Sequence, residues 1–412
     1  MFQNNPNNLL PIISYLGFAY LAISLLLLFP FSLILLDTFF RILFLIVSWM
    51  PHPKNLTPPI DITSNSRILY LFVANNEQRV IGESIKRIPQ VAGLAPGDSI
   101  IVIADHCSDQ TVDMAVKAGA TVYERTDGKP GKSEVLSWFT NTISKQIEAD
   151  IVVVLDADTL VGENFSTKIK SAFEREVDVV QVFVHPIPSS NSPLSLLASY
   201  SELLSQKIDD EARSRLGWSV PLRGTGMAFR KRIFDEICRG INTQVDDIEL
   251  SLLLMEMGIT VHYCSKAEIL DPKTNNILGL ARQRGRWLKG QRHIWNAQMQ
   301  NFVKSVRLGL PNWSLVQSLI LKPKTALAVV KILLAGILVI VPYGGGHRIV
   351  FFLIWGSILV DLLYYLAGLK YVPNPLTTLL AMFSAPLFLV LWIISWGFSI
   401  MPSQGWLRAR EE

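Results

Sequence analysis

Cysteine is scarce in this sequence, which has only Cys107, Cys238 and Cys264 among its 412 residues. Their spacing fits neither a paired zinc-ligand motif nor a disulfide framework, so we expect the domain that holds them to lie in a reducing compartment. A strong excess of one charge is also lacking, because 38 basic and 34 acidic residues leave a formal net charge of +4. That balance argues against a nucleic-acid-binding protein.

Apolar residues, in contrast, are abundant. They make up 50% of the sequence, and the mean hydropathy is +0.33. The excess lies at the two ends of the chain, whereas the middle, from about Ser64 to Ser305, has the composition of an ordinary globular domain. This middle part is long enough for one large α/β domain.

The long apolar runs at both ends predict membrane-spanning helices, since about 20 apolar residues cross a bilayer. Near the N-terminus, Leu10–Phe29 is long enough for one span, and Ser32–Trp49 is either a second span or a continuation that leaves the bilayer. Near the C-terminus, Ala326–Val341 and Ile349–Leu366 predict two spans. Leu376–Ile400 predicts either a third span or a segment that lies in the interface or re-enters.

These features predict four parts of the chain. They are an N-terminal membrane segment of one or two spans (1–50), a proline-rich linker (51–65), an α/β domain (66–305) whose last part (282–305) is basic and interfacial, and a C-terminal membrane region of two or three spans with a short basic tail (306–412). The prolines 51, 53, 58 and 59 stiffen the linker.

Within the α/β domain, apolar β-branched runs alternate with helical stretches. The predicted strands are Ile68–Ala74, Ser99–Ala104, Ala120–Glu124, Ile151–Leu155, Val179–His185, Met227–Phe229 and Ile259–Cys264. Strands that alternate with helices at this spacing predict a mostly parallel, Rossmann-like sheet with right-handed crossovers. Ser192 followed by Pro193 predicts the start of a helix that runs to about Leu216.

Two carboxylates, Asp156 and Asp158, follow the strand Ile151–Leu155 directly. Ligands of open α/β sheets bind beyond the carboxyl ends of the strands. Oxygen ligands there suit Mg²⁺ or Mn²⁺, which is commonly held by one or two carboxylates together with substrate phosphates. An acidic turn at a strand end is the alternative. Polar residues also end the first and second strands, which favours a site at this edge of the sheet.

Two further segments carry charge of one sign. Asp246, Asp247 and Glu249 open a helix, where complementation of the helix dipole would alone explain acidic residues. Arg282 to His293 is strongly basic, which is typical of a helix on an anionic membrane surface. Beside a metal site, its arginines would also suit a diphosphate group.

Taken together and in this order, the motifs resemble those of membrane-bound family 2 glycosyltransferases, such as cellulose, hyaluronan and poly-N-acetylglucosamine synthases. The resemblance covers about Ser66 to Gln300. It is carried by Ala74–Glu77, Ala104–Asp109, Gly131–Lys132, Asp156–Asp158, Gly224–Phe229, Asp246–Asp247 and Gln283–Trp287.

The resemblance implies a GT-A fold, a nucleotide-sugar donor that is usually a UDP-sugar, a divalent metal ion (Mg²⁺ or Mn²⁺) and inversion at the anomeric carbon. Asp247 is implied as the general base and Asp158 as the metal ligand. The implied donor-binding residues are Glu77, Asp105, Lys132, Asp156, Gln283 and Arg286, and the implied acceptor-binding residues are Trp287, Gly224 and Thr225. Asp105 would read the uracil ring.

Two motifs depart from the family pattern. The usual Pro-Ala-His-Asn-Glu is Val73-Ala-Asn-Asn-Glu77 here, and the usual Thr-Glu-Asp is Val245-Asp-Asp247. The second change leaves open whether Asp246 or Asp247 is the base. The chain also lacks the length of a many-span channel, although Gln-x-x-Arg-Trp is typical of processive enzymes, so polymer export stays open.

The sequence therefore predicts an inverting glycosyltransferase at the plasma (inner) membrane, acting on a polysaccharide or lipid-linked acceptor. Basic residues beside the spans, such as Lys54 and Arg67, place the α/β domain in the cytosol. A membrane transporter with a nucleotide-sensing domain is a second hypothesis, but its path would need ionisable groups, and Asp361 is the clearest one within the spans. A membrane-anchored nucleotidyltransferase is a third, and it gives no role to Gln283–Trp287.

Overall fold

The computed structural model describes residues 31–50, 65–273 (apart from 175, 189, 191, 242 and 244), 278–292 (apart from 280 and 283), 304, 309–320, 324–340 and 345–401. The predicted span Leu10–Phe29, most of the proline-rich linker and the basic tail lie outside these residues. The chain divides into two compact units. Unit 1 comprises Met1–Leu43 and Pro323–Leu366, and unit 2 comprises Phe44–Lys322 and Ala367–Glu412.

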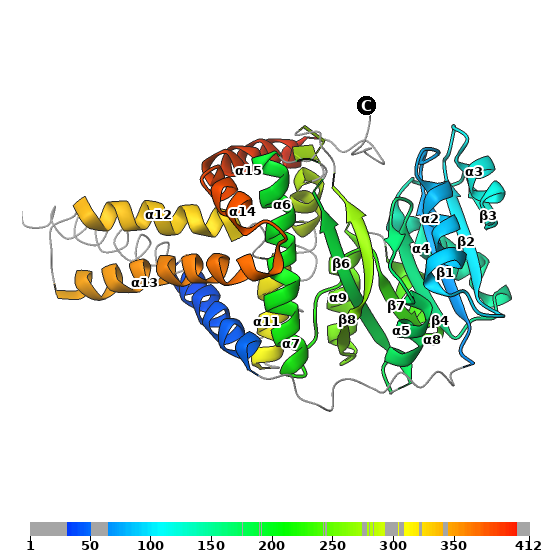
Figure 1. Ribbon diagram of the computed structural model, residues 1–412, viewed down its shortest axis with the longest axis horizontal. Coiled ribbons are helices and arrows are strands. Elements are labelled where there is room, and N and C mark those ends of the chain that lie inside the picture. The colour runs from blue at the N-terminus through cyan, green and yellow to red at the C-terminus, as the bar shows by residue number, and fades with distance from the viewer. Residues whose placement is uncertain are drawn as a thin grey trace, which may run out of the picture. The chain divides into compact units, whose positions relative to one another are not determined.

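Unit 2 contains an eight-stranded sheet with the order β3-β2-β1-β4-β7-β6-β8-β5 (Figure 1). The strands are β1 (Ile68–Ala74), β2 (Ser99–Asp105), β3 (Thr121–Arg125), β4 (Ile151–Asp156), β5 (Leu160–Val161), β6 (Val179–Ile187), β7 (Met227–Arg230) and β8 (Val261–Pro272). All seven predicted strands are therefore present, β8 extends eight residues beyond the predicted end at Cys264, and the two-residue β5 was not predicted.

The parallel arrangement expected from the sequence is confirmed in one half of the sheet. There β1 pairs in parallel with β2 and β4, and β2 with β3. The other half is mixed, because β7 runs antiparallel to both β4 and β6, whereas β6 and β8 are parallel. The reversed strand β7 has only four residues, and so short a run carries no sequence signal for its direction.

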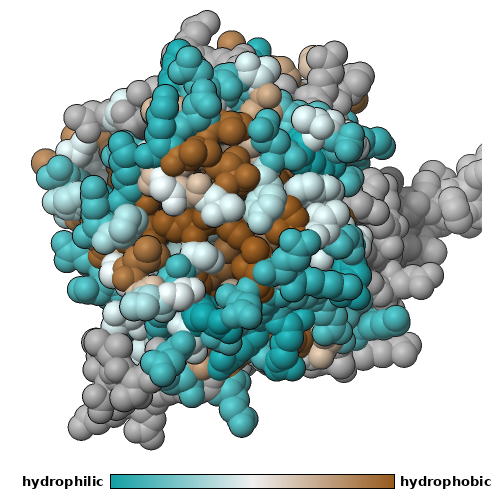
Figure 2. Space-filling model, turned by 90° about the vertical axis from the view of Figure 1, so that its right-hand side faces the viewer, coloured by the Kyte–Doolittle hydropathy of each residue, from teal (hydrophilic) through white to brown (hydrophobic). Residues whose placement is uncertain are grey.

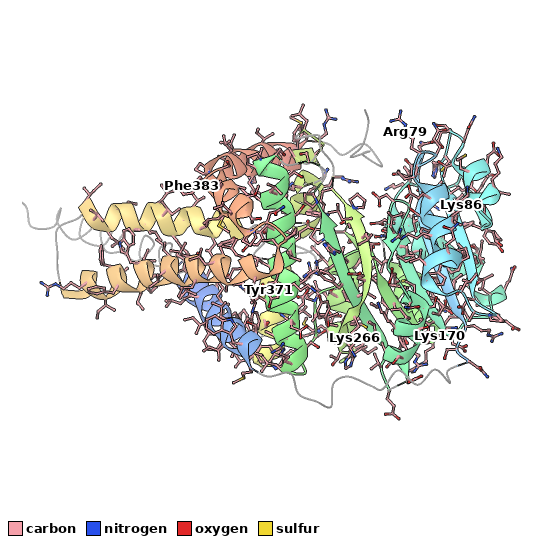
Figure 3. All side chains as sticks on the ribbon, viewed as in Figure 1. Arg79, Lys86, Lys170, Lys266, Tyr371 and Phe383 are labelled. Carbon is pink, nitrogen blue, oxygen red and sulfur yellow. The ribbon has the colours of Figure 1, made fainter. Side chains whose placement is uncertain are left out.

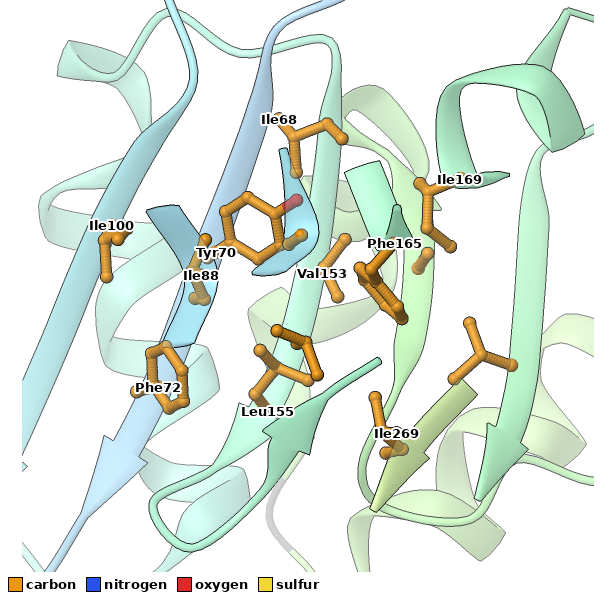
Figure 4. Packing of buried hydrophobic residues seen from close by; sticks show 14 of the residues in the cluster. Ile68, Tyr70, Phe72, Ile88, Ile100, Val153, Leu155, Phe165, Ile169 and Ile269 are labelled. Atoms are coloured by element: carbon orange, nitrogen blue, oxygen red, sulfur yellow. The ribbon is translucent and has the colours of Figure 1, made fainter. Parts of the chain in front are cut away.

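Alternate residues of the central strands fill two separate cores, one on each face of the sheet. Tyr70, Phe72 and Val153 face helices α2, α3 and α5, with Phe165 of α5 packed among them (Figure 4). Their neighbours in sequence, such as Leu71, face α4, α8 and α9 on the other side. Burial on both faces explains why these strands are continuous apolar runs.

The helices of unit 2 connect the strands or follow the sheet. Their bounds are α2 (Ile81–Arg87), α3 (Thr111–Lys117), α4 (Lys132–Thr142), α5 (Phe165–Phe173), α6 (Pro193–Leu204), α7 (Glu211–Arg215), α8 (Lys231–Ile237), α9 (Asp246–Glu256), α11 (Leu310–Ile320), α14 (Pro375–Met382) and α15 (Ala385–Ile400). The predicted helix start is confirmed, because the Ser192 hydroxyl accepts a hydrogen bond from the Ser195 amide. A π-helical segment, Ser205–Asp210, joins α6 to α7.

The edge strand β3 exposes polar side chains. Figure 2 shows the face of the molecule on which β3 and α3 lie, with hydrophobic residues gathered at its centre and hydrophilic residues around them. Thr121 and Glu124 of β3 are exposed. Polar and charged side chains on an edge strand oppose pairing with another chain.

Helices α14 and α15 are bent by 58° relative to each other, so the predicted segment Leu376–Ile400 is either a broken span or a re-entrant pair. Phe383 lies at the bend and is 80% exposed (Figure 3). One side of α15 packs through Leu391 against Ala198 of α6 and against Ala281. The other side exposes large apolar side chains, including Ile393. This side of α15 is therefore apolar and exposed in the described structure.

Unit 1 consists of apolar helices. The helix Phe31–Trp49 contributes its residues up to Leu43, and α12 (Lys324–Ile340) and most of α13 (Gly345–Gly368) supply the rest. Among the described residues, Phe31–Trp49 and Arg348–Tyr371 are long and apolar enough to cross a membrane, each with a mean hydropathy of 2.1. The apolar part of α12, Leu327–Ile340, is shorter than a full span.

Candidate active site

The carboxyl ends of β1, β2 and β4 meet at one edge of the sheet, as the sequence predicts. The register aligns Ala74 of β1 with Ala104 of β2, and Val73 with Asp156 of β4. The polar segments that follow these strands therefore lie side by side. This edge holds the predicted donor-binding residues Glu77, Asp105 and Asp156.

Hydrogen bonds tie the loop after β1 to the loop after β2. The Asn76 side-chain oxygen accepts from the amides of Ser108 (2.7 Å) and Asp109 (3.2 Å), and the Glu77 amide donates to the Thr111 hydroxyl at 2.7 Å. Asn76 and its neighbour across the strands, His106, both have positive φ angles, of 56° and 51°. Such strained residues persist where the surrounding structure fixes them, and they cluster at functional sites.

Asp105 is fully buried and holds the loop that leads to Lys132. Its carboxylate accepts hydrogen bonds from Arg125 Nη1 at 2.5 Å and from the Gly131 amide at 3.0 Å, and it contacts His106 Nδ1 at 2.8 Å. Arg125 also donates to the Lys129 carbonyl. The sequence analysis missed Arg125, which ends an edge strand and has no motif around it. Because these donors occupy the carboxylate, base reading by Asp105 stays a prediction.

Lys132, the first residue of α4, joins three separate segments of the site. Its Nζ atom lies 2.5 Å from Asp156 Oδ1, 2.6 Å from the Gly224 carbonyl oxygen and 3.8 Å from Asp246 Oδ2. Burial alone would lower the pKa of Lys132, but the carboxylates of Asp156 and Asp246 outweigh burial and hold that pKa above its usual value. The ammonium group is therefore a fixed positive charge at the centre of the site.

Asp246 and Asp247 begin α9 and stand in different surroundings. Asp246 is 8% exposed, and within the described part of the chain its Oδ2 atom has no hydrogen-bond partner. Burial raises the pKa of Asp246 to about 7, with Lys132 opposing the rise and Asp247 and Asp156 adding to it. Asp247 is half-buried, and its Oδ1 atom accepts from the Ile248 amide. Of the two carboxylates, Asp247 is thus the more accessible.

The carboxylates that follow β4 fit a divalent ion that is shared with a substrate. Asp156 is 45% exposed and Asp158 is half-buried, and they stand two positions apart at the strand end. Among the described residues, no group of three or more His, Cys, Asp or Glu side chains is placed to hold a metal ion. Mg²⁺ and Mn²⁺ accept such an arrangement, because waters and phosphate oxygens complete their coordination.

The segment Arg223–Gly226 contacts the end of β4. The Thr225 hydroxyl accepts from the Asp156 amide at 3.1 Å and lies 2.9 Å from the Thr159 hydroxyl. Thr225 is only 4% exposed, so its hydroxyl orients Asp156, and the acceptor contact expected for it stays a prediction. The buried side chain of Gln181 donates to the Thr225 carbonyl and accepts from the Arg223 amide. The sequence analysis missed Gln181, although a polar residue inside the apolar run of β6 is a signal that could have pointed to it.

A helix described at 284–292 carries Arg286 and Trp287, whereas Gln283 lies outside the described residues. Trp287 is 38% exposed. Arg286 Nε is buried and has no hydrogen-bond partner among the described residues. Burial lowers the pKa of Arg286, and the charge of Asp156 opposes this fall, so the guanidinium lies within electrostatic reach of Asp156. A buried donor beside a carboxylate pair suits an anionic ligand group.

Glycine sets the position of this helix. A Cβ atom at Gly290 would lie 1.6 Å from Val245 Cγ2, and one at Gly285 would lie 2.7 Å from Phe398 Cβ of α15. The helix therefore packs directly against the residue that precedes Asp246. Sequence analysis gave these glycines no role, because a close approach between distant segments leaves no local pattern.

An ion-paired cluster that was not predicted lies within electrostatic reach of Asp156. Lys273 Nζ lies 2.5 Å from Glu202 Oε2 and 2.6 Å from Asp271 Oδ2. Burial raises the pKa of Asp271, Lys273 opposes the rise, and the charge of Asp156 adds to it. Glu202 lies on α6 and the other two at the end of β8, so long-range pairing hid this cluster from sequence patterns.

An α/β sheet with a carboxylate pair at the end of β4 and basic groups around it is the arrangement expected of a GT-A glycosyltransferase. Residues 66–290 match the family described as glycosyltransferase-like family 2, which is more than half of the chain, and the protein belongs to this family.

Among curated proteins, chitin synthase 1 of Phytophthora sojae (strain P6497) is 21% identical over 267 residues, 56% of this chain. The chain spans only 29% of the length of that relative. Among solved structures, the mannosyltransferase PcManGT from Pyrobaculum calidifontis, in complex with GDP-Man and Mn²⁺, is similar with a TM-score of 0.53 at 18% identity, covering 81% of this chain and 94% of that one. Glucosyl-3-phosphoglycerate synthase from Mycobacterium tuberculosis, in complex with Mg²⁺ and UDP, has a TM-score of 0.34 at 19% identity, with coverages of 53% and 75%.

Proposed function

We propose that this glycosyltransferase moves a sugar from a nucleotide-sugar donor, with inversion and with a divalent metal ion, to a polysaccharide or lipid-linked acceptor at a membrane. The observation that carries the proposal is the meeting of Lys132, Asp156 and Asp246 at the carboxyl edge of the sheet. A fixed cation between carboxylates, with Arg286 nearby, suits a leaving diphosphate.

The donor is proposed to bind along the ends of β1, β2 and β4. Glu77 and Asp105 are proposed for the nucleoside end, and Lys132, Asp156 and Arg286 for the diphosphate end. Gln283, which lies outside the described residues, keeps the diphosphate role that the family resemblance implies. Asp158, with Asp156 beside it, would hold Mg²⁺ or Mn²⁺. When bound, such an ion neutralises negative charge on the departing diphosphate. Lys132 and Arg286 contribute positive charge of their own, and the charge of Asp156 favours the cationic form of both side chains against burial.

The acceptor is proposed to approach from the side of Trp287, whose partly exposed ring offers a flat apolar surface for a sugar. Gly224 and Thr225 lie beside the same carboxylates. Asp247 is the proposed base, because it is the more accessible aspartate of the pair and a carboxylate can take the proton of an acceptor hydroxyl. A single carboxylate base with a metal favours inversion, whereas a hydrolase would need two carboxylates flanking the bond.

The membrane setting is proposed from the apolar helices. Two of them are long enough to cross a bilayer, and the exposed apolar side of α15 suits lipid. We place the catalytic unit in the cytosol of a multi-pass protein of the plasma (inner) membrane, because basic residues beside the spans favour that side. The bend between α14 and α15 supports an interfacial or re-entrant segment and, with it, a cytosolic C-terminus.

The test is release of nucleoside diphosphate by the purified full chain in detergent. The donor panel would include UDP-glucose, UDP-N-acetylglucosamine and GDP-mannose, since the similar proteins are a chitin synthase and an enzyme bound to GDP-Man. We expect release from one donor class only, dependent on Mg²⁺ or Mn²⁺ and stopped by chelator. Release of nucleoside diphosphate that continues in excess chelator would contradict the proposed dependence on a metal ion. A product with retained anomeric configuration would contradict inversion.

A further inference from the structure

Four charged side chains lie in the helices of unit 1, away from the helix ends, and glycosyl transfer gives them no role. We call Asp37, Arg41, Lys331 and Asp361 the membrane charge cluster. The first two lie on the helix Phe31–Trp49, Lys331 lies on α12, and Asp361 lies on α13. Asp361 is near the middle of its span, about 20 Å from Arg348 and about 15 Å from Tyr371 at 1.5 Å per residue.

Each carboxylate of the cluster contacts both cations. Asp37 Oδ2 lies 3.0 Å from Arg41 Nε and 3.1 Å from Lys331 Nζ. Asp361 lies 3.1 Å from Arg41 Nε and 2.8 Å from Lys331 Nζ. The four side chains carry two positive and two negative charges, so the cluster is neutral, and its contacts join all three helices.

The cluster is closed off by apolar and aromatic side chains. The exposed fractions of its side chains are 1% for Asp37, 4% for Arg41 and 1% for Lys331, with 14% for Asp361. The Arg41 guanidinium lies 4.7 Å from the centre of the Tyr364 ring. Ile34, Ala335 and Ile354, one from each helix, form an apolar core beside it. Among the described residues, the four charged side chains are therefore largely shielded by the helices that carry them.

We propose that the membrane charge cluster is a lock that joins the three helices of unit 1 inside a bilayer. An unpaired charge that faces lipid costs free energy. Each of the three helices is therefore more stable in a bilayer when its charged side chains pair with those of the other helices. Lys331 interrupts the apolar part of α12, and pairing with Asp37 and Asp361 removes its charge from lipid. The same pairing selects one arrangement of the helices. The inference needs membrane insertion of unit 1 but does not depend on sugar transfer.

The first test measures survival of the folded full chain in detergent at a fixed elevated temperature, by fluorescence-detected gel filtration. Lys331→Met and Asp361→Asn each leave one uncompensated buried charge, and we expect each to shorten the half-life by at least about tenfold. The double variant keeps the Asp37–Arg41 pair and is neutral, so we expect a half-life within about threefold of the unmodified chain. Ser357→Ala is the matched control, since that buried hydroxyl donates only to Ile354 of its own helix.

A lock is overturned if the two single variants survive as long as the unmodified chain, which is also what a transport path for ions predicts. It is also overturned if the half-life of the double variant is reduced by as much as the reductions of the two single variants combined. Activity is not part of the readout, so a failure of the lock and a failure of the proposed transfer are told apart.

The second test covers the case in which the single variants do not fold. In a chain whose three native cysteines are replaced by serine, Asp37→Cys with Lys331→Cys should be joined by a short bifunctional thiol reagent in native membrane vesicles, because the side chains of Asp37 and Lys331 meet at 3.1 Å. The control pair uses Ile332→Cys in place of Lys331→Cys, because Ile332 is 62% exposed. Equal cross-linking of both pairs, or none of the first pair, contradicts the arrangement.

Discussion

Asp246 is the carboxylate whose removal gives the clearest test of the site's electrostatics. It is 8% exposed, and its pKa is raised from 3.8 to about 7. A shift of about 3 units corresponds to about 4 kcal/mol between its protonated and ionised forms. The unfolded chain ionises this group at its ordinary pKa, so the folded state binds one more proton between about pH 4 and pH 7. Stability from this group is therefore present at low pH and is lost as the pH rises through 7.

Asp246→Asn removes this titration, because the amide stays neutral throughout. Between pH 5 and pH 8.5 we expect the unmodified chain to lose about 3 kcal/mol relative to the variant, given about 1.4 kcal/mol per pH unit up to pH 7. For a domain of this size, that loss corresponds to roughly 6–12 °C in unfolding temperature.

The assay is thermal unfolding of the full chain in detergent with chelator, followed by intrinsic tryptophan fluorescence at pH 5, 6, 7 and 8.5. Glu256→Gln is the matched control, because Glu256 is an exposed carboxylate at the other end of the same helix, α9. The difference in unfolding temperature between Asp246→Asn and the unmodified chain should grow with pH, and the difference for Glu256→Gln should stay flat. Curves that run parallel for Asp246→Asn and the unmodified chain would refute the assignment of a raised pKa to this group.

Three further predictions concern the proposed chemistry and the packing that supports it. Asp158→Asn should abolish turnover with Mn²⁺ while circular dichroism stays unchanged, and full activity of this variant would sink the metal assignment. Asp247→Asn should keep donor binding, measured by nucleotide titration, but lower transfer by about 10²-fold or more; a dead Asp246→Asn beside an active Asp247→Asn would move the base by one residue. Gly290→Ala should lower stability by about 1–3 kcal/mol together with activity, because its Cβ would lie 1.6 Å from Val245, whereas Gly240→Ala, with no atom within 4 Å of its Cβ, should stay near the unmodified chain.

Strong local patterns made the parallel half of the fold predictable. The run Ile68–Ala74 is the strand β1 with the predicted bounds, and Ile151–Leu155 ends at the carboxylates where ligands of such sheets bind. Both runs are apolar on both faces because two cores need them. The reversed strand β7 was identified as a strand but not as antiparallel, since strand direction depends on how the chain returns to the sheet rather than on residue alternation.

For the candidate site, sequence motifs supplied the expected residues but not the contacts between them. Lys132 and Asp156 were both expected in donor binding, but their direct ion pair was not, and neither was the third contact with Asp246, which is 114 positions from Lys132 (246 − 132). Arg125 and Gln181 support the site from outside its motifs. Sequence patterns report periodicity and short spacing, whereas these contacts depend on where the sheet brings distant segments together.

The charged residues of unit 1 are a second case in which sequence patterns do not reveal contacts between distant segments. Read along the chain, Asp361 and Lys331 are isolated exceptions in apolar runs, and isolated charges within spans suggest a transport path. In the structure each has two partners of opposite sign, and Asp37 reaches Lys331 across 294 positions of sequence. Partners of opposite charge on other helices favour ion pairing between helices, rather than a transport path, as the role of these residues. Because unit 1 draws on both ends of the chain, no window of sequence contains both halves of that pairing.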